Sequence, residues 1–198
     1  MSAIPKKRFT SQEYLERERK SDLRNEFYSG EIFAMSGASF EHTCIVDNLV
    51  FELTQRLLGG SCRVLSKDMR VKVNASGLYT YPDLIVVCGK PDLEDSHGDT
   101  LLNPQIIFEV LSPTTEAYDR GQKFNHYRQI PTLKEYVLVS QDRPMIERYI
   151  RQSDVSWNLT DFKPPQESFE LLSVAASVKI ADVYRSVQFQ NIERDLAN

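Results

Sequence analysis

The chain has 198 residues, of which 41% are apolar and 26% are charged, and its formal net charge is −4. These values are typical of one globular domain with a sizeable core. A protein that coats a nucleic-acid duplex non-specifically is usually basic, so the charge counts against that class. No apolar stretch approaches the ~18 residues that a membrane-spanning helix needs, and we expect no membrane partner.

Three cysteines, Cys44, Cys62 and Cys88, show neither a C-x-x-C motif nor the spacing of a zinc site. Each lies in an apolar segment, so we predict buried free thiols. A sparse and odd set of cysteines is typical of a reducing compartment, and we expect a cytoplasmic protein.

The N-terminal part of the chain predicts a short helix followed by a β-hairpin. Residues 10–13, Thr-Ser-Gln-Glu, have the form of a capping box at a helix start. Residues 24–28 and 31–35 flank a Ser-Gly pair, which is a two-residue turn signal. The second strand of this hairpin begins at Glu31.

The clearest amphipathic helix runs from residue 40 to residue 58. Its apolar residues recur at spacings of three and four. Ser39 is suited to cap its start, and two glycines after residue 58 end it. His42 lies at the edge of the buried face, near the N-terminus of this helix.

Two apolar runs, residues 81–88 and 105–111, predict buried strands. Both are short, rich in Ile and Val, and bounded by Pro, Gly and Asn. Because they are apolar on both faces, the sheet that holds them should be covered on each side. Weaker alternation at 63–65 and 69–73 predicts further strand, and a polar loop spans 89–103.

The rest of the chain predicts one more helix and the remaining strands. The helix begins with Asp119 as N-cap and Gln122 as its capping-box partner. It ends at Gln129, because Pro131 blocks its continuation. The other predicted elements are a strand at 135–140, a hairpin of 145–150 and 155–159, a strand at 169–172 and a helical turn at 180–184.

These elements predict one domain over residues 1–198, of α/β class, with a central mixed sheet flanked by helices. The core spans about 39–140. An N-terminal helix and hairpin occupy 10–36, and C-terminal strands and a tail occupy 145–198.

Each of the two buried runs carries one carboxylate, Asp83 in the first and Glu109 in the second. A buried acid is costly unless it is paired, hydrogen-bonded or bound to a cation. If the two strands are adjacent, the two carboxylates can converge at one end of the sheet. Divalent cations such as Mg²⁺ prefer oxygen ligands and take one or two protein carboxylates. The pair therefore predicts a metal site, where a cation would activate water and stabilise charge on a phosphate.

Pro82-Asp83, followed 26 residues later by Glu109-Val110-Leu111, resembles the motif of the PD-(D/E)xK nuclease superfamily. A wider set of segments resembles the Uma-type family of restriction-endonuclease-like proteins, over roughly residues 8–187. These segments are Tyr-Ser-Gly-Glu-Ile at 28–32, Met-Ser-Gly at 35–37, His42, Tyr-Pro-Asp-Leu-Ile-Val at 81–86, Glu-Val-Leu-Ser-Pro-Thr-Thr at 109–115, the set Asp119, Lys123 and Tyr127, and Glu-Tyr-Val-Leu-Val at 135–139.

The resemblance implies a restriction-endonuclease-like core with an N-terminal hairpin, and a Mg²⁺- or Mn²⁺-dependent endonuclease that hydrolyses DNA. It implies Asp83, Glu109 and the backbone carbonyl of Val110 as metal ligands. The superfamily has a lysine two residues after the acid, where this chain has Leu111. The resemblance implies that Lys123, on the next helix, takes the role of that lysine.

The expected catalytic set is therefore Asp83, Glu109 and Lys123. Glu31, His42 and Tyr127 also match family positions and form a second tier of candidates. By analogy with the superfamily, a homodimer would supply the two sites that cleavage of two DNA strands often uses.

Plainer readings of the same residues remain open. Asp83 could start a strand and bind backbone amides, and Glu109 could form a buried salt bridge with Lys123, which is weak support for function. His42 and Tyr127 could be core residues, and Glu31 a strand-edge acid. For the whole protein, the alternative is a nuclease-like fold that serves as a non-catalytic binding or assembly module.

Overall fold

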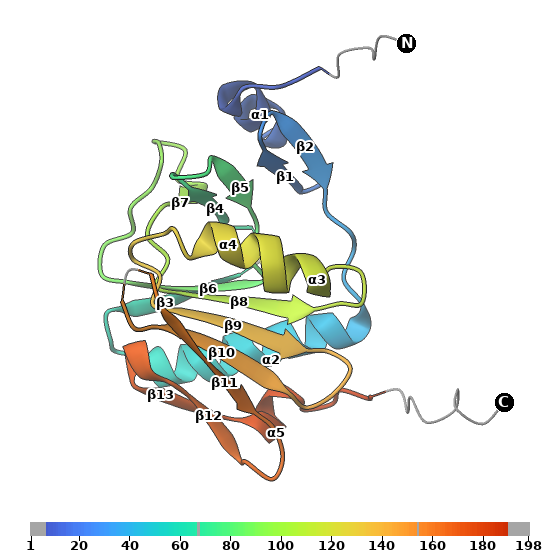
Figure 1. Ribbon diagram of the computed structural model, residues 1–198, viewed down its shortest axis with the longest axis vertical. Coiled ribbons are helices and arrows are strands. Elements are labelled where there is room, and N and C mark those ends of the chain that lie inside the picture. The colour runs from blue at the N-terminus through green and yellow to red at the C-terminus, as the bar shows by residue number, and fades with distance from the viewer. Residues whose placement is uncertain (1–6, 67, 154, 190–198) are drawn as a thin grey trace, which may run out of the picture.

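The computed structural model describes residues 7–66, 68–153 and 155–189 (Figure 1). Its centre is a six-stranded sheet in the order β11-β10-β9-β8-β6-β3. Neighbouring strands are antiparallel except β8 and β9, which are parallel. The sheet is therefore mixed, and the predicted α/β class is confirmed. The bounds of these strands are β3 Cys62–Ser66, β6 Leu84–Cys88, β8 Ile106–Leu111, β9 Glu135–Ser140, β10 Ile146–Arg151 and β11 Trp157–Phe162.

A second sheet, smaller and nearer the N-terminus, has the order β2-β1-β5-β4-β7. It includes the predicted hairpin, β1 and β2, whose register pairs Tyr28 with Glu31 across the turn. The separation of this sheet from the central one was not predicted from the sequence. Its strands are β1 Asn25–Tyr28, β2 Glu31–Ala34, β4 Arg70–Val73, β5 Leu78–Thr80 and β7 Thr100–Leu101.

Helices cover both faces of the six-stranded sheet, as the apolar runs predicted. The helix α2 (Phe40–Leu57) packs on one face together with β12 (Ser168–Leu171), β13 (Ala176–Lys179) and α5 (Ile180–Val183). Residues that follow β8 cover the other face and bury Tyr127 against the strands. Both β8 and β9 are buried along their whole length, because each of their faces meets a packed layer.

Two helix starts follow the predicted capping chemistry. Thr10 and Glu13 form the capping box ahead of α1 (Ser11–Glu18), with Thr10 N–H donating to Glu13 Oε2 at 2.8 Å. Ser39 caps α2 by accepting a hydrogen bond from the His42 N–H at 3.1 Å.

The predicted start of the helix after β8 is wrong. The N-cap is Thr115, four residues earlier, and helical structure runs from α3 (Glu116–Tyr118) through a π-helical turn, η1 (Asp119–Lys123), into α4 (Phe124–Tyr127). Asp119 lies inside this helix and is buried, with its carboxylate beside the ammonium of Lys123. Asp119 therefore serves as a buried counter-ion of Lys123 and not as the expected helix cap.

The C-terminal elements follow the predicted order, with two short additions. The 3₁₀ turn η2 (Leu172–Val174) and the strand β13, which pairs with β12, were not predicted. Residues 190–198 of the predicted tail lie outside the described residues. Among the helices that the structure describes, none has the length and apolar character to cross a membrane.

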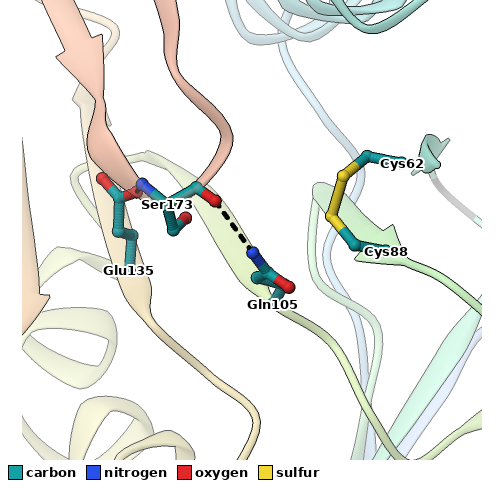
Figure 2. Close-up of a disulfide and its surroundings, with 5 residues drawn as sticks. All are labelled: Cys62, Cys88, Gln105, Glu135 and Ser173. Carbon is teal, nitrogen blue, oxygen red and sulfur yellow. Dashed lines mark hydrogen bonds between the residues drawn. A yellow bond between two sulfur atoms is a disulfide. The ribbon is translucent and has the colours of Figure 1, made fainter. Parts of the chain in front are cut away.

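The prediction that all three cysteines are free thiols is wrong for two of them. Cys62 and Cys88 face each other in the register of β3 and β6, and they form a disulfide (Figure 2). Their 26-residue separation carries no signal by itself, because only the strand pairing brings them together. Cys44 is a free cysteine.

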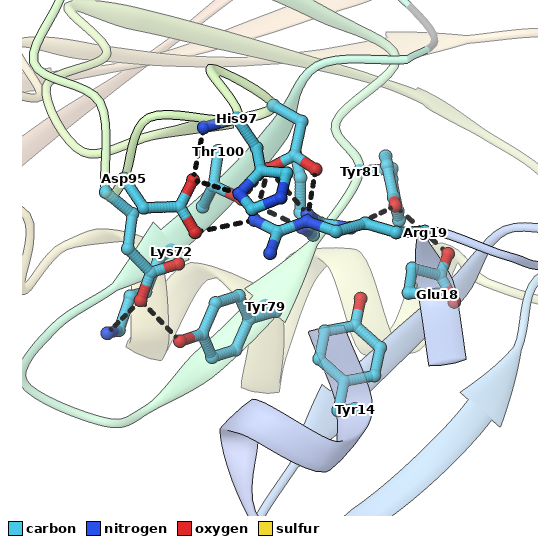
Figure 3. Close-up of polar contacts among 12 residues, drawn as sticks. Tyr14, Glu18, Arg19, Lys72, Tyr79, Tyr81, Asp95, His97 and Thr100 are labelled. Carbon is cyan, nitrogen blue, oxygen red and sulfur yellow. Dashed lines mark hydrogen bonds and ion pairs between the residues drawn. The ribbon is translucent and has the colours of Figure 1, made fainter. Parts of the chain in front are cut away.

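A polar network anchors α1 to the second sheet (Figure 3). Arg19 bonds Asp95 at 2.7 Å and Asp99 at 2.8 Å, both in the loop that follows β6. Glu18 is buried and accepts hydrogen bonds from the Asn25 N–H at 2.8 Å and from the Tyr81 hydroxyl at 3.0 Å. The network thereby fixes the start of β1 and positions the hairpin.

We expect removal of the disulfide, by Cys62→Ser or by reductant, to lower the free energy of unfolding by about 3 kcal/mol. The bond closes a loop of 26 residues, and the lost constraint on the unfolded chain sets this size. Urea denaturation with and without dithiothreitol measures it, with Cys44→Ser as the control that should respond to reductant like wild type. Equal stability of wild type in both conditions would contradict the prediction.

Candidate functional site

Asp83 and Glu109 lie side by side, but Asp83 immediately precedes β6 instead of lying within it as predicted, whereas Glu109 lies on the neighbouring strand β8. β6 and β8 are antiparallel partners with Leu84 opposite Phe108, so the same register places Asp83 opposite Glu109. The Val110 N–H donates to Asp83 Oδ2 at 2.8 Å, which ties the residue before β6 to β8. The two acids therefore converge at one end of the central sheet.

His42 contacts the second oxygen of Asp83. Its Nε2 lies 2.9 Å from Asp83 Oδ1, and the side chains of His42 and Asp83 are 15% and 22% exposed. The first turn of α2 positions this histidine, one turn ahead of the buried Ile45. His42 is thus a direct partner of the acid, and Asp83 has one contact on each carboxylate oxygen.

Lys123 reaches Glu109 from the helical segment that covers the sheet. Its Nζ lies 3.0 Å from Glu109 Oε1, and the Tyr127 hydroxyl donates to the same oxygen at 2.8 Å. Glu109 is 3% exposed, Lys123 5% and Tyr127 0%. The expected lysine from the next helix is therefore in place, and the buried salt bridge considered from the sequence is present too.

The π-helical turn η1 brings a further acid to the lysine. Asp119 Oδ1 lies 3.5 Å from Lys123 Nζ, one turn away on the same helix. The Tyr136 hydroxyl of β9 donates to the Asp119 carbonyl at 3.0 Å and holds this turn on the sheet. Single π-helical turns inside helices are frequent at functional sites.

Glu26, on β1, was missed by the sequence analysis. Its Oε1 lies 3.5 Å from Lys123 Nζ and accepts a hydrogen bond from the Thr80 hydroxyl. Glu31 opens β2 as predicted, but among the described contacts Glu26 is the hairpin acid that joins this cluster. The alternation along β1 held a signal for it, since Phe27 packs toward α1 and its neighbour Glu26 must face the other way.

Lys123 is held as a cation. Burial lowers the pKa of its ammonium group, but the carboxylates of Glu109, Glu26 and Asp119 outweigh burial and hold the pKa well above its ordinary value. A lysine in this state is a poor proton acceptor. It can hold a phosphate or water in place and offset negative charge.

The acidic side chains around Lys123 outnumber its single positive charge. Burial raises the pKa of Glu109 well above its ordinary value; Lys123 opposes the rise, and the charges of Asp119 and Asp83 add to it. Burial likewise raises the pKa of Asp119. One ammonium thus faces the three acids Glu26, Glu109 and Asp119, with Asp83 acting on Glu109, and a divalent cation would favour the ionised form of these acids.

The oxygen atoms present fit a hard divalent cation. Asp83 and Glu109 supply two carboxylates, and Val110, the residue after Glu109 on β8, carries the backbone carbonyl that the resemblance implies as a further ligand. The described contacts of Glu109 fall on Oε1, and no described residue bonds Oε2. Within the described residues, no group of three or more His, Cys, Asp or Glu side chains is gathered to hold a metal ion. The candidate ligand set is two carboxylates and one carbonyl.

A surface hollow lies elsewhere on the molecule. A surface cavity of about 710 Å³ opens between α1 and the loop that carries Asp95 and His97. It includes none of the residues around Lys123, and the ion pairs of Arg19 line it. We therefore place the site by its chemistry, at the end of β6 and β8.

We expect Lys123→Met to lower the free energy of unfolding by roughly 3–5 kcal/mol at neutral pH, because it leaves buried acids without their cation. The loss should grow as pH rises from 5 to 8. Lys123 lowers the pKa of Glu109, so its removal lets buried Glu109 keep its proton to a still higher pH in the variant than in wild type, and rising pH then favours unfolding of the variant more strongly. Urea denaturation at both pH values measures this, and an equal loss at each would contradict it.

Comparison with known proteins gives the family. The Uma2 family model, described as "Putative restriction endonuclease", matches residues 11–182. "Uncharacterized protein slr1290" of Synechocystis sp. is 33% identical over 187 residues, which cover 94% of this chain and 97% of that protein. "Uncharacterized protein sll1609" of the same organism is 36% identical over 152 residues, 77% of this chain and 86% of that one.

A crystal structure of a protein described as "a putative nuclease belonging to DUF820", from Anabaena variabilis, has the same fold. Its TM-score is 0.72 at 18% identity, and the match covers 89% of this chain and 97% of that one. The family model spans most of the sequence, and the restriction-endonuclease-like resemblance of the sequence is confirmed. The chain therefore belongs to the Uma2 family.

Proposed function

We propose that this protein is a Mg²⁺- or Mn²⁺-dependent endonuclease that hydrolyses DNA phosphodiester bonds at the Asp83–Glu109 pair. The observation that carries the proposal is the register of β6 and β8, which brings two acids together with Lys123 Nζ 3.0 Å from one of them. The nuclease-like description of the family supports the same reaction class.

In this proposal the metal ligands are Asp83, Glu109 and the Val110 carbonyl. A divalent cation at these oxygens lowers the pKa of a bound water and stabilises charge on the phosphate. His42 and the Val110 N–H fix the two oxygens of Asp83, and Tyr127 orients Glu109. Such partners restrict the rotation of each carboxylate and so reduce the cost of assembling the site.

Lys123 holds the scissile phosphate or the attacking water. Its raised pKa keeps the positive charge at working pH, so it stabilises the negative charge that builds up during the reaction. Cleavage of both strands of a duplex often uses two such sites, and we propose a homodimer as the form that acts on duplex DNA.

One observation favours a second candidate, a nuclease-like fold that acts as a non-catalytic binding or assembly module. Glu109 and Lys123 are nearly inaccessible and already satisfy each other as an ion pair. A purely structural pair would have this geometry too. Metal binding and strand cleavage distinguish the two candidates.

We expect Asp83→Asn to weaken Mg²⁺ or Mn²⁺ binding by at least ~10-fold, since the substitution removes one of two carboxylate ligands and keeps the shape of the side chain. Isothermal titration calorimetry of the metal into wild type and variant measures the change. Asp161→Asn, an exposed acid on β11, is the matched control and should bind as wild type does. Identical binding by Asp83→Asn and wild type would refute the ligand assignment.

We expect Glu109→Gln and Lys123→Met each to lower the rate of DNA cleavage by ~10²-fold or more, because one removes a metal ligand and the other a fixed positive charge. A supercoiled plasmid, a single-stranded DNA oligonucleotide and an RNA oligonucleotide serve as parallel substrates, with and without EDTA. Circular dichroism verifies that each variant is folded. Cleavage that survives EDTA, or that both substitutions leave unchanged, would exclude the mechanism.

A further inference from the structure

Lys123 and the proposed metal compete for the same carboxylate. Lys123 Nζ lies 3.0 Å from Glu109 Oε1, and Glu109 is a proposed metal ligand. A divalent cation bound to Glu109 repels the ammonium at this range. A site that binds metal and keeps its lysine therefore needs other counter-charges that can hold Lys123 while Glu109 is occupied.

Two acids are close enough to Lys123 to supply this counter-charge. Glu26 Oε1 and Asp119 Oδ1 each lie 3.5 Å from Lys123 Nζ. Asp119 belongs to the same helical segment as the lysine, so it stays with Lys123 whatever happens at Glu109. Glu26 comes from a different element, β1, and approaches from the second sheet.

The position of Glu26 is firmly fixed. The register of β1 and β5 pairs Phe27 with Tyr79, which places Glu26 beside the fully buried Thr80. The Thr80 hydroxyl donates to Glu26 Oε1, the same oxygen that faces Lys123. The side chain of Glu26 is 12% exposed. Glu18, in the network of Figure 3, accepts a hydrogen bond from the N–H of Asn25, the first residue of the strand that carries Glu26.

We propose that Glu26 is a positioning residue that holds Lys123 away from Glu109 when metal binds. It keeps Glu109 available to the cation and keeps the lysine aimed at the site. The N-terminal hairpin thereby contributes a positioning residue to the site. This inference rests on the proposed function, because it concerns the metal that Asp83 and Glu109 would bind.

A double-mutant cycle separates this role from a merely structural ion pair. Mn²⁺ alone is titrated by calorimetry into wild type, Glu26→Gln, Lys123→Met and the double variant. Glu26→Gln should weaken Mn²⁺ binding by about tenfold, a size typical of residues that orient metal ligands. In the Lys123→Met background the same change should have less than about a twofold effect, since no ammonium remains to compete.

Two further variants test the inference even if Lys123→Met does not fold. Glu26→Asp keeps the charge at a shorter reach and should restore part of the affinity that Glu26→Gln loses. Glu94→Gln is the matched control, because it removes a carboxylate from another lysine pair, Lys72 Nζ and Glu94 Oε1 at 2.6 Å, outside this site. It should leave Mn²⁺ binding unchanged.

The outcomes separate the two levels of the proposal. If wild type binds Mn²⁺ and Glu26→Gln binds it equally well, the positioning role of Glu26 is overturned and the proposed function stands. An equal loss on Glu26→Gln with and without Lys123 also overturns the role, because it shows an effect that does not pass through the lysine. Failure of wild type to bind Mn²⁺ overturns the proposed function, and this inference with it.

Discussion

The burial of Glu109 in the middle of an apolar strand is the constraint on which the site depends. β8 is covered on both faces, so its carboxylate cannot be satisfied by water and must find partners inside the protein. Lys123 and Tyr127 are those partners, and they come from the segment that closes the sheet. The π-helical turn of that segment ends at Lys123 and so carries the cation that pairs with this one acid.

Lys123, the cationic partner of Glu109, lies close to more acidic side chains than its single positive charge can neutralise. Glu26 and Asp119 approach it from a strand of the second sheet and from its own helix, and Asp83 adds charge from the next strand. A purely structural salt bridge needs one acid for one base. This surplus of acidic groups, beside the Asp83–Glu109 pair, is the electrostatic reason to propose a divalent cation there.

Much of this arrangement was predictable from local sequence patterns. The three- and four-residue spacing identified α2, and short Ile- and Val-rich runs identified β6 and β8, with Glu109 on β8 and Asp83 just ahead of β6. Interactions between distant segments were not predictable in the same way. The disulfide depends on the register of β3 with β6, and the place of Glu26 on the register of β1 with β5. The residues around Asp119 have the local pattern of a helix cap. In the structure the Asp119 carboxylate instead lies beside the ammonium of Lys123, inside the helical segment.

The central claim is that Asp83 and Glu109 hold one divalent cation between β6 and β8. Crystals soaked in Mn²⁺ and measured at an anomalous wavelength test it most directly. We expect one anomalous peak at the end of these two strands, within about 2.0–2.3 Å of an Asp83 oxygen, a Glu109 oxygen and the Val110 carbonyl. Strong peaks elsewhere with none at this position, in crystals whose site is open to solvent, would contradict it.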